Sequence, residues 1–307
     1  MAIGAIDVQA KLRAPASSVA PYTAIGVIPN LAGSRPSQVG SSGAASLSPL
    51  PTSVRDVSQL AVALDAVVAT AGGASVGMTL VELGGTDPVG WSVNGGEVFT
   101  AASTDKLAAL MLEAENIAEG KTDPNGVVCF QSDDYESGWF DDYAVGACFT
   151  RNELALRAGI YSDNTAGHML VRDVGGPDAL NVWAASVGAT SSEFFSANTT
   201  TSSDLATLWD VEALGDLGGA AAQAWLYPML TDTRTESGVP AGVAGVTAVH
   251  KTGTIDLVDN DAALVTSGPD GAYVLVVMTD GLGDAAGWQL IASISAAVWQ
   301  FEAARPQ

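Results

Sequence analysis

Lysine is scarce in this sequence, and two of its four lysines stand in short segments whose residue types suit acyl transfer. Ser103 and Lys106 are three residues apart, so on a helix the Lys106 amine can reach the Ser103 hydroxyl. A serine hydroxyl is a poor nucleophile at neutral pH and needs a neighbouring base. The pair therefore predicts a catalytic nucleophile, Ser103, and its base, Lys106. An ordinary helical surface is the alternative for this segment taken alone.

Two further segments follow in the order expected of serine acyl-transfer enzymes. Ser162-Asp163-Asn164 comes after a short helical pattern and would carry a hydroxyl and a carboxamide into a cleft. We expect Ser162 to relay a proton to the leaving nitrogen and Asn164 to hold a substrate amide. Asp163 is expected to satisfy backbone donors in the loop.

The third segment, Lys251-Thr252-Gly253-Thr254, lies on a predicted strand whose glycine lets a substrate approach the backbone. We expect Thr252, Gly253 and Thr254 to bind substrate, with the backbone N–H groups of Ser103 and Thr254 as donors to the oxyanion. A second cation, Lys251, close to Lys106 would favour the neutral and basic form of the Lys106 amine. This predicts a catalytic role for both lysines.

Hydrophobic periodicity and turn residues predict the elements that must position these segments. Helices are predicted from Val57, over Ser103–Ala118, twice or more between Thr150 and Gly188, and over Ala286–Ala304. Strands are predicted over Ala74–Leu83, Gly90–Thr100, Val246–Ile255, Ala262–Thr266 and Ala272–Thr279.

This order of elements predicts an α+β fold, with one antiparallel five-stranded sheet flanked by helices and an inserted all-helical lobe. The α/β lobe would comprise residues 55–102 and 240–307, and the helical lobe residues 103–239, with the active site between them. Residues 1–54 are rich in Ser, Gly, Pro and Ala, so they are predicted to be disordered or loosely packed.

Composition excludes several classes of partner. The 307 residues carry a formal net charge of −22, from 34 acidic and 12 basic residues, whereas binding to nucleic acid needs clustered Lys and Arg. No apolar run reaches the roughly 18 residues of a membrane helix. The cysteines, Cys129 and Cys148, are either bridged or two buried thiols. We expect a monomer that needs no cofactor and no metal.

The residues Ser103–Lys106, Tyr161–Ala166, Gly175–Pro177 and His250–Thr254 together resemble the class A serine β-lactamases and their penicillin-binding relatives. The resemblance covers roughly residues 57–304. It implies a β-lactamase-like fold and an acyl-enzyme hydrolase, with the nucleophile, base, proton relay and electrostatic lysine at Ser103, Lys106, Ser162 and Lys251. It also implies an extracytoplasmic location, although residues 1–33 show no clear signal peptide.

The sequence departs from the family pattern at two places. Where class A enzymes have a long loop with a deacylating Glu, this chain has only the short stretch 188–198, whose one carboxylate is Glu193. Glu193 is a candidate deacylation base, with a solvated loop residue as the alternative. Glu236 stands where the family often has an Arg that precedes the Lys-Thr-Gly strand, and Arg234 is two residues away.

The acidic and aromatic segment 133–143 is placed by the resemblance at the rim of the cleft, where Trp139 or Tyr143 would gate the substrate. A surface loop pinned by its aromatic rings is the alternative, and a Ca²⁺ site built from its aspartates (Asp133, Asp134, Asp141, Asp142) is another. His250 should face away from Lys251, which argues against a Ser-His-Asp triad.

The hypothesis from the sequence is a serine hydrolase of class A β-lactamase type that hydrolyses a lactam or amide through an acyl-enzyme on Ser103. The substrate would be a small β-lactam, peptide or ester. A D,D-peptidase or esterase of the same family is one alternative. A penicillin-binding or sensor domain that is acylated once, without turnover, is another.

Overall fold

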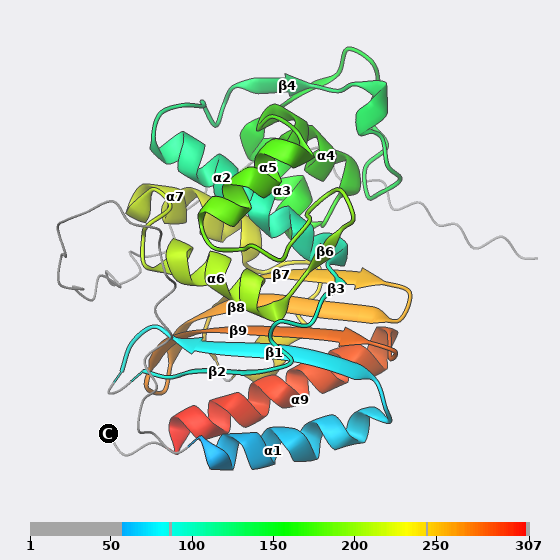
Figure 1. The fold of residues 1–307 in the computed structure, drawn as a ribbon. Helices are drawn as coiled ribbons and strands as arrows, with labels where there is room; N and C mark the ends of the chain where they lie inside the picture. Colours follow the sequence, from blue (N-terminus) through cyan, green and yellow to red (C-terminus); the bar gives the residue numbers. More distant parts are fainter. Residues whose placement is uncertain (1–56, 86–87, 244, 305–307) are drawn as a thin grey trace, which may run out of the picture.

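The computed structural model describes residues 57–85, 88–243 and 245–304, and Figure 1 shows them in three layers. Two helices, α1 (Ser58–Val68) and α9 (Asp284–Ala303), cover one face of a central sheet. A lobe of helices covers the other face. The N-terminal segment 1–54 lies outside the described residues.

The central sheet has five antiparallel strands in the order β2-β1-β9-β8-β7. Their bounds are β1 (Ser75–Glu82), β2 (Gly90–Val93), β7 (Ala248–Ile255), β8 (Val258–Gly268) and β9 (Gly271–Asp280). This confirms the predicted α+β class and the five-stranded antiparallel sheet. Strand β7 lies at one edge, which is the edge nearest the start of α2.

The prediction of one continuous strand over Gly90–Thr100 is wrong, because this segment contains two short strands. It is broken at Asn94, which has a φ of 51°, and at the turn that follows. Its second part is a separate strand, β3 (Phe99–Thr100), which pairs with β6 (Thr199–Thr200) instead of the central sheet. The left-handed conformation of Asn94 stops the ladder, because an extended strand cannot include it.

The sheet buries apolar side chains on both faces. Along β9, Val274, Val276 and Met278 belong to the core under the helical lobe, whereas Tyr273, Leu275 and Val277 belong to the core under α1 and α9. Successive strand residues point to opposite faces, so an uninterrupted apolar run is the pattern of a strand covered on both sides.

The helical lobe is built around α2 (Asp105–Ala118), in which residues 105–114 are all buried. Thr150, Asp163 and Thr201 each cap the start of a helix by accepting a backbone N–H. The other helices of the lobe are α3 (Arg151–Ile160), α4 (Asn164–Asp173), α5 (Pro177–Ser186), α6 (Ser202–Ala213) and α7 (Gly219–Leu226). The short α8 (Val239–Gly242) precedes β7.

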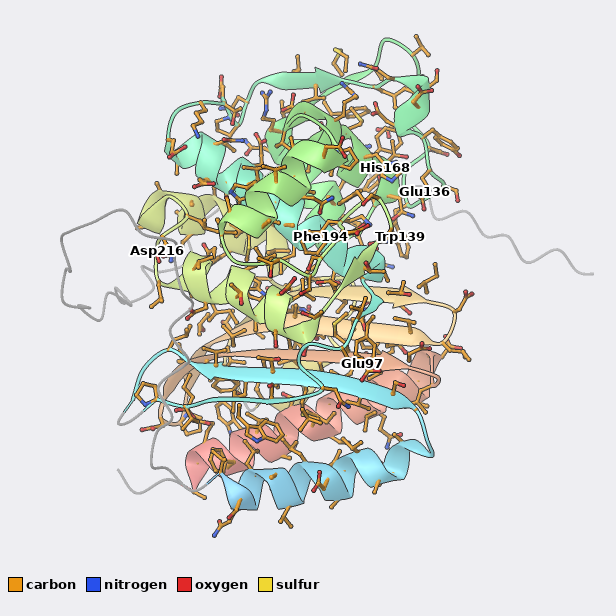
Figure 2. The ribbon with its side chains drawn as sticks, viewed as in Figure 1. Glu97, Glu136, Trp139, His168, Phe194 and Asp216 are labelled. Carbon is orange, nitrogen blue, oxygen red and sulfur yellow. A yellow bond between two sulfur atoms is a disulfide. The ribbon has the colours of Figure 1, made fainter. Side chains whose placement is uncertain are left out.

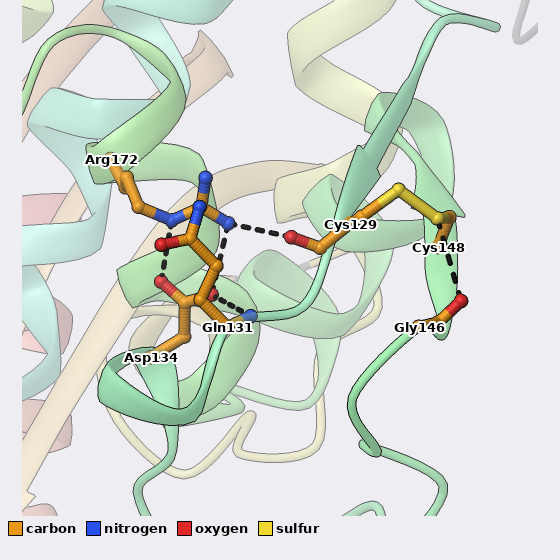
Figure 3. The surroundings of a disulfide bond; sticks show 6 residues. All are labelled: Cys129, Gln131, Asp134, Gly146, Cys148 and Arg172. Carbon is orange, nitrogen blue, oxygen red and sulfur yellow. Dashed lines mark hydrogen bonds and ion pairs between the residues drawn. A yellow bond between two sulfur atoms is a disulfide. The ribbon is translucent and has the colours of Figure 1, made fainter.

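A disulfide bond joins Cys129 and Cys148, which lie opposite each other in the small sheet formed by β4 (Val127–Cys129) and β5 (Cys148–Thr150) (Figure 3). The sequence left this question open. The bond closes the segment 130–147, and Arg172 of α4 binds both the Asp134 carboxylate and the Cys129 carbonyl oxygen. The acidic segment is therefore fixed to the lobe at its base.

Candidate active site

The start of α2 presents Ser103 and Lys106 together. Ser103 lies in a 3₁₀ turn (Ala102–Thr104) that leads directly into α2, and Ala102 has a φ of 47°. Lys106 is buried, and its Nζ donates hydrogen bonds to Ser103 Oγ (2.8 Å) and to Asn164 Oδ1 (2.9 Å). Two predicted site residues, Ser103 and Asn164, thus meet at the amine of a third, Lys106.

The other lysine makes a second hydrogen bond to a serine. Lys251 Nζ donates to Ser162 Oγ (2.9 Å) and to the carbonyl oxygen of Thr252 (2.8 Å). Ser162 has a φ of 58°, a conformation uncommon for residues other than glycine. Such backbone strain clusters at functional sites, where the surroundings hold it in place. The structure therefore brings the third segment, on β7, against the second.

Burial and the neighbouring charge of Lys106 lower the pKa of Lys251 to about 7. Near neutral pH the two lysines therefore carry less than two full positive charges. The role of Lys106 as the neutral base stays a prediction from the sequence. Asp105, next to Lys106, is buried, and desolvation raises the pKa of its carboxyl despite the charges of both lysines.

Strand β7 packs directly on the backbone before and at Ser103. A Cβ at Gly253 would lie 2.7 Å from the Ala101 oxygen, 2.8 Å from the Thr104 nitrogen and 3.0 Å from the Ser103 nitrogen. Only glycine permits this approach. It places the strand that carries Thr254 beside the backbone N–H of Ser103, and the Thr254 hydroxyl is held by Asp259 at 2.6 Å.

A pocket of about 190 Å³ opens at this junction. Four of the predicted residues line it: Ser103, Lys106, Asn164 and Thr254. The pocket lining does not include Ser162, Lys251, Thr252 and Gly253. Lys251 joins Ser162 to Thr252, and Gly253 packs on the backbone at Ser103. The lining also includes residues that the sequence did not single out for this site, among them Asp105, Glu136, His168 and Asn198.

Glu136 and His168 form one side of the pocket, and Figure 2 shows them close together in the helical lobe. Glu136 Oε1 accepts a hydrogen bond from Asn164 Nδ2 (2.8 Å), and its Oε2 lies 3.2 Å from His168 Nε2. Glu136 comes from the acidic segment and His168 from α4. The sequence offered no local signal for this pairing, because the two residues are far apart along the chain.

Glu193, the candidate deacylation base from the sequence, is exposed and lies outside the pocket lining. Its backbone forms a bridge with Thr199.

Trp139 and Tyr143 also lie outside the lining. Tyr143 donates to Asp163 Oδ1 (2.6 Å) and packs against Phe149, so it pins the acidic segment to the lobe. Trp139 is 59% exposed, with the Arg234 guanidinium 4.7 Å above its ring.

Asp163 is buried and accepts three hydrogen bonds, from the backbone N–H groups of Ala166 and Trp139 and from Tyr143. Asp134 and Asp142 are each engaged by an arginine, Arg172 and Arg157. Within residues 57–85, 88–243 and 245–304, no group of three or more His, Cys, Asp or Glu is placed to hold a metal ion.

His250 faces away from Lys251 and is fully buried between two carboxylates. Its Nδ1 lies 2.9 Å from Asp261 Oδ1, and its Nε2 lies 3.1 Å from Glu236 Oε1. Burial alone would lower the pKa of His250, but the Asp261 charge and the bonds to Asp261 and Glu236 raise it to about 9. Glu236 thus pairs with His250 of β7, on the face of the strand opposite Lys251.

The chain matches the model of the β-lactamase enzyme family over residues 59–301 and belongs to that family. The structure is similar to PBP-A, with 26% sequence identity and a TM-score of 0.75 over 82% of this chain and 98% of PBP-A. It is similar to a β-lactamase from Sphaerobacter thermophilus, with 26% identity and a TM-score of 0.72 over 82% of this chain and 100% of that one.

A β-lactamase from Burkholderia phymatum shares the fold, with 23% identity and a TM-score of 0.69 over 81% of this chain and 100% of that one. A search of curated proteins found no match. In the part of the chain that the structure describes, no helix has the length and apolar character needed to cross a membrane.

Proposed function

We propose that this protein is a serine hydrolase of class A β-lactamase type, which forms an acyl-enzyme on Ser103. The observation that carries the proposal is the pair of lysine–serine hydrogen bonds, Lys106 to Ser103 at the pocket and Lys251 to Ser162, with the charge of Lys106 acting on Lys251. Membership of the family and the similarity to PBP-A and to β-lactamases support it.

In the proposed acylation, the neutral Lys106 amine takes the proton of the Ser103 hydroxyl, and Ser103 Oγ attacks the carbonyl carbon of the substrate. The bond from this carbon to the leaving nitrogen or oxygen then breaks. The leaving atom takes a proton from Ser162, and the Lys106 ammonium restores that proton through Lys251, so that Lys106 is neutral again. The proton count is conserved, and no cofactor enters.

The negative charge that develops on the carbonyl oxygen would be held by the backbone N–H groups of Ser103 and Thr254. Each such donor contributes on the order of 3 kcal/mol in comparable sites. The close approach of Gly253 to the Ser103 backbone supports this role, because it sets β7 beside the start of α2. Asn164, Thr252 and Thr254 would bind the rest of the substrate.

The substrate class we propose is a β-lactam. The solved structures include an acyl-enzyme complex of a PBP-A mutant with penicillin G, at 26% identity to this chain. A D,D-peptidase or esterase activity, or a penicillin-binding domain without turnover, is the second candidate, favoured by the short stretch 188–198 and by Glu193 lying outside the pocket. We expect a monomer located outside the cytoplasm, in keeping with its disulfide.

Intact-protein mass spectrometry after mixing with a penicillin tests the proposal, with a chromogenic cephalosporin assayed in parallel. A covalent adduct on Ser103 that is absent from Ser103→Ala, together with many turnovers, supports the β-lactamase. A persistent adduct without turnover supports the second candidate. Lack of any adduct with penicillins, cephalosporins and activated esters would contradict acylation at Ser103.

A further inference from the structure

One carboxyl group in the pocket has no part in the proposed acylation. Asp105 lines the pocket beside Ser103 and is only 4% exposed. Its Oδ1 lies 3.9 Å from Lys106 Nζ and has no hydrogen-bond partner among the described residues. Buried polar atoms without partners are uncommon in native proteins and indicate a role or an unseen water.

Asn198 brings a second acceptor of the same kind to this pocket. Its Oδ1 is also buried and lacks a partner within the described part of the chain, while its Nδ2 donates to the Ala102 oxygen at 3.5 Å. Asn198 has a φ of 52° and its backbone oxygen accepts the N–H of Ala101, so the turn holds it against the residues before Ser103. Two acceptors suit a water, which donates two hydrogen bonds.

The pocket is large enough for such a water. Its volume of about 190 Å³ holds several waters, each of which takes about 30 Å³ in the liquid. Of the other carboxylates considered, Glu136 already binds Asn164 and His168 and is half exposed, and Glu193 lies outside the lining. Among the residues that line the pocket, Asp105 is therefore the buried carboxylate.

We propose that Asp105 is the general base that activates the hydrolytic water in deacylation, with Asn198 Oδ1 as the second acceptor that orients this water. This inference rests on the proposed acyl-enzyme at Ser103. The water oxygen bonds to the acyl carbon while its proton passes to the Asp105 carboxylate. The bond from the acyl carbon to Ser103 Oγ then breaks, and the proton held by Asp105 passes through Lys106 to Ser103, so that Asp105 is a carboxylate and Lys106 a neutral amine again.

The electrostatics of the site suit this role. Burial raises the pKa of Asp105, and the positive charges of Lys106 and Lys251 oppose that rise. A carboxylate with a raised pKa is a stronger base toward water. The charged or titratable groups that face it are Lys106 on its own helix, Lys251 on β7, His168 on α4 and Glu136 in the segment 130–147.

The test compares Asp105→Asn with the wild type by intact-protein mass spectrometry after a penicillin pulse. We expect Ser103 to be acylated in both, and the adduct to decay about 100-fold or more slowly in the variant, since general-base catalysis contributes about 10²–10⁴-fold. In turnover assays, kcat and KM should fall together while kcat/KM changes little, because only deacylation is slowed. The wild-type deacylation rate should fall on acidification at a pH above the range of an ordinary aspartate.

Asp65→Asn is the matched control, because it makes the same chemical change on an exposed face of α1, on the far side of the sheet. Its adduct should decay as in the wild type. Asp105→Ala provides a second variant, in which added formate should restore part of the deacylation rate.

Four results would overturn the assignment: wild-type decay in Asp105→Asn, a folded Asp105→Asn that is no longer acylated, accumulation of adduct in Glu193→Gln instead, or a wild-type adduct as persistent as that of the variant. All four leave acylation at Ser103 intact in the wild type. A wild type that forms no adduct at all would remove the proposed function and this inference with it.

Discussion

The amine of Lys251, on edge strand β7, lies 2.9 Å from the hydroxyl of Ser162, which precedes helix α4 in the helical lobe. This hydrogen bond joins residues 89 positions apart in the chain and connects the sheet to the helical lobe. Since Lys251 is fully buried, its charge acts through protein rather than water and is weakly screened.

Replacing Lys251 by Met should slow acylation about 100-fold or more, because Ser162 loses its donor and the site loses a buried positive charge. Stopped-flow acylation with a chromogenic cephalosporin measures the effect. Lys121→Met is the matched control: this lysine is exposed and pairs with Glu119, so its removal should leave the rate unchanged. Equal rates in the two variants would contradict a role for Lys251.

Replacing Gly253 by Ala should both destabilise the protein and impair acylation. The new methyl group would meet the backbone at Ala101, Ser103 and Thr104, which cannot move aside as a flexible side chain does. We expect a loss of about 1–3 kcal/mol in the free energy of unfolding, as for other overpacked sites. Gly96→Ala, whose Cβ would meet no atom within 4 Å, is the control for urea unfolding.

The stabilising effect of His250 should depend on pH in a definite direction. Its folded-state pKa of about 9 lies above the ordinary 6.5, so its contribution is complete below pH 6.5 and is lost as the pH rises through 9. His250→Asn should therefore lower the melting temperature relative to wild type more at pH 6 than at pH 9.5. Lys251 titrates in both proteins, so the comparison isolates His250. A difference independent of pH would contradict the charged state.

Reduction of the Cys129–Cys148 disulfide should destabilise the lobe and loosen the segment that carries Glu136. A loop of this size contributes about 3 kcal/mol in the chain-entropy model. Thermal unfolding with and without dithiothreitol measures the loss, and the penicillin concentration needed for half-maximal acylation should rise. The variant with both cysteines replaced by Ser should match the reduced protein and be insensitive to dithiothreitol. A reduced protein as stable as the oxidised one would contradict this prediction.

Much of the fold could be predicted from the sequence because its signals are local. The apolar run at β9, the helical spacing after Val57 and the Gly-rich turns define elements without reference to distant residues. The break at Asn94 could not be predicted in the same way. Its left-handed conformation belongs to a turn that leads into β3, and β3 pairs with β6, about 100 residues further along the chain.

At the candidate site, sequence reasoning found the residues of the three segments but not the pocket around them. The structure places Ser103 and Asn164 within hydrogen-bonding distance of Lys106. The three-residue spacing predicted the contact with Ser103 but not the one with Asn164, and the roles of all three residues stay predictions. Asp105 lies between Ser103 and Lys106 in the sequence, yet the neighbouring residues give no sign that its carboxyl is buried. Asn198 reaches the same pocket as Asp105 only through the tertiary fold, which brings the Asn198 carbonyl oxygen to the N–H of Ala101, just before Ser103.

The burial of α2 restricts which residues of this protein can change during evolution without loss of folding or activity. A helix that is enclosed along residues 105–114 and directly follows the turn of the candidate nucleophile leaves little freedom for substitution, since a change there alters core packing and site geometry at once. Adaptation to new substrates should therefore accumulate in the two exposed segments at the pocket, 130–147 and 193–198, whose ends the disulfide and β6 hold in place. Conservation and variation would then be divided between the buried helix and the tethered loops.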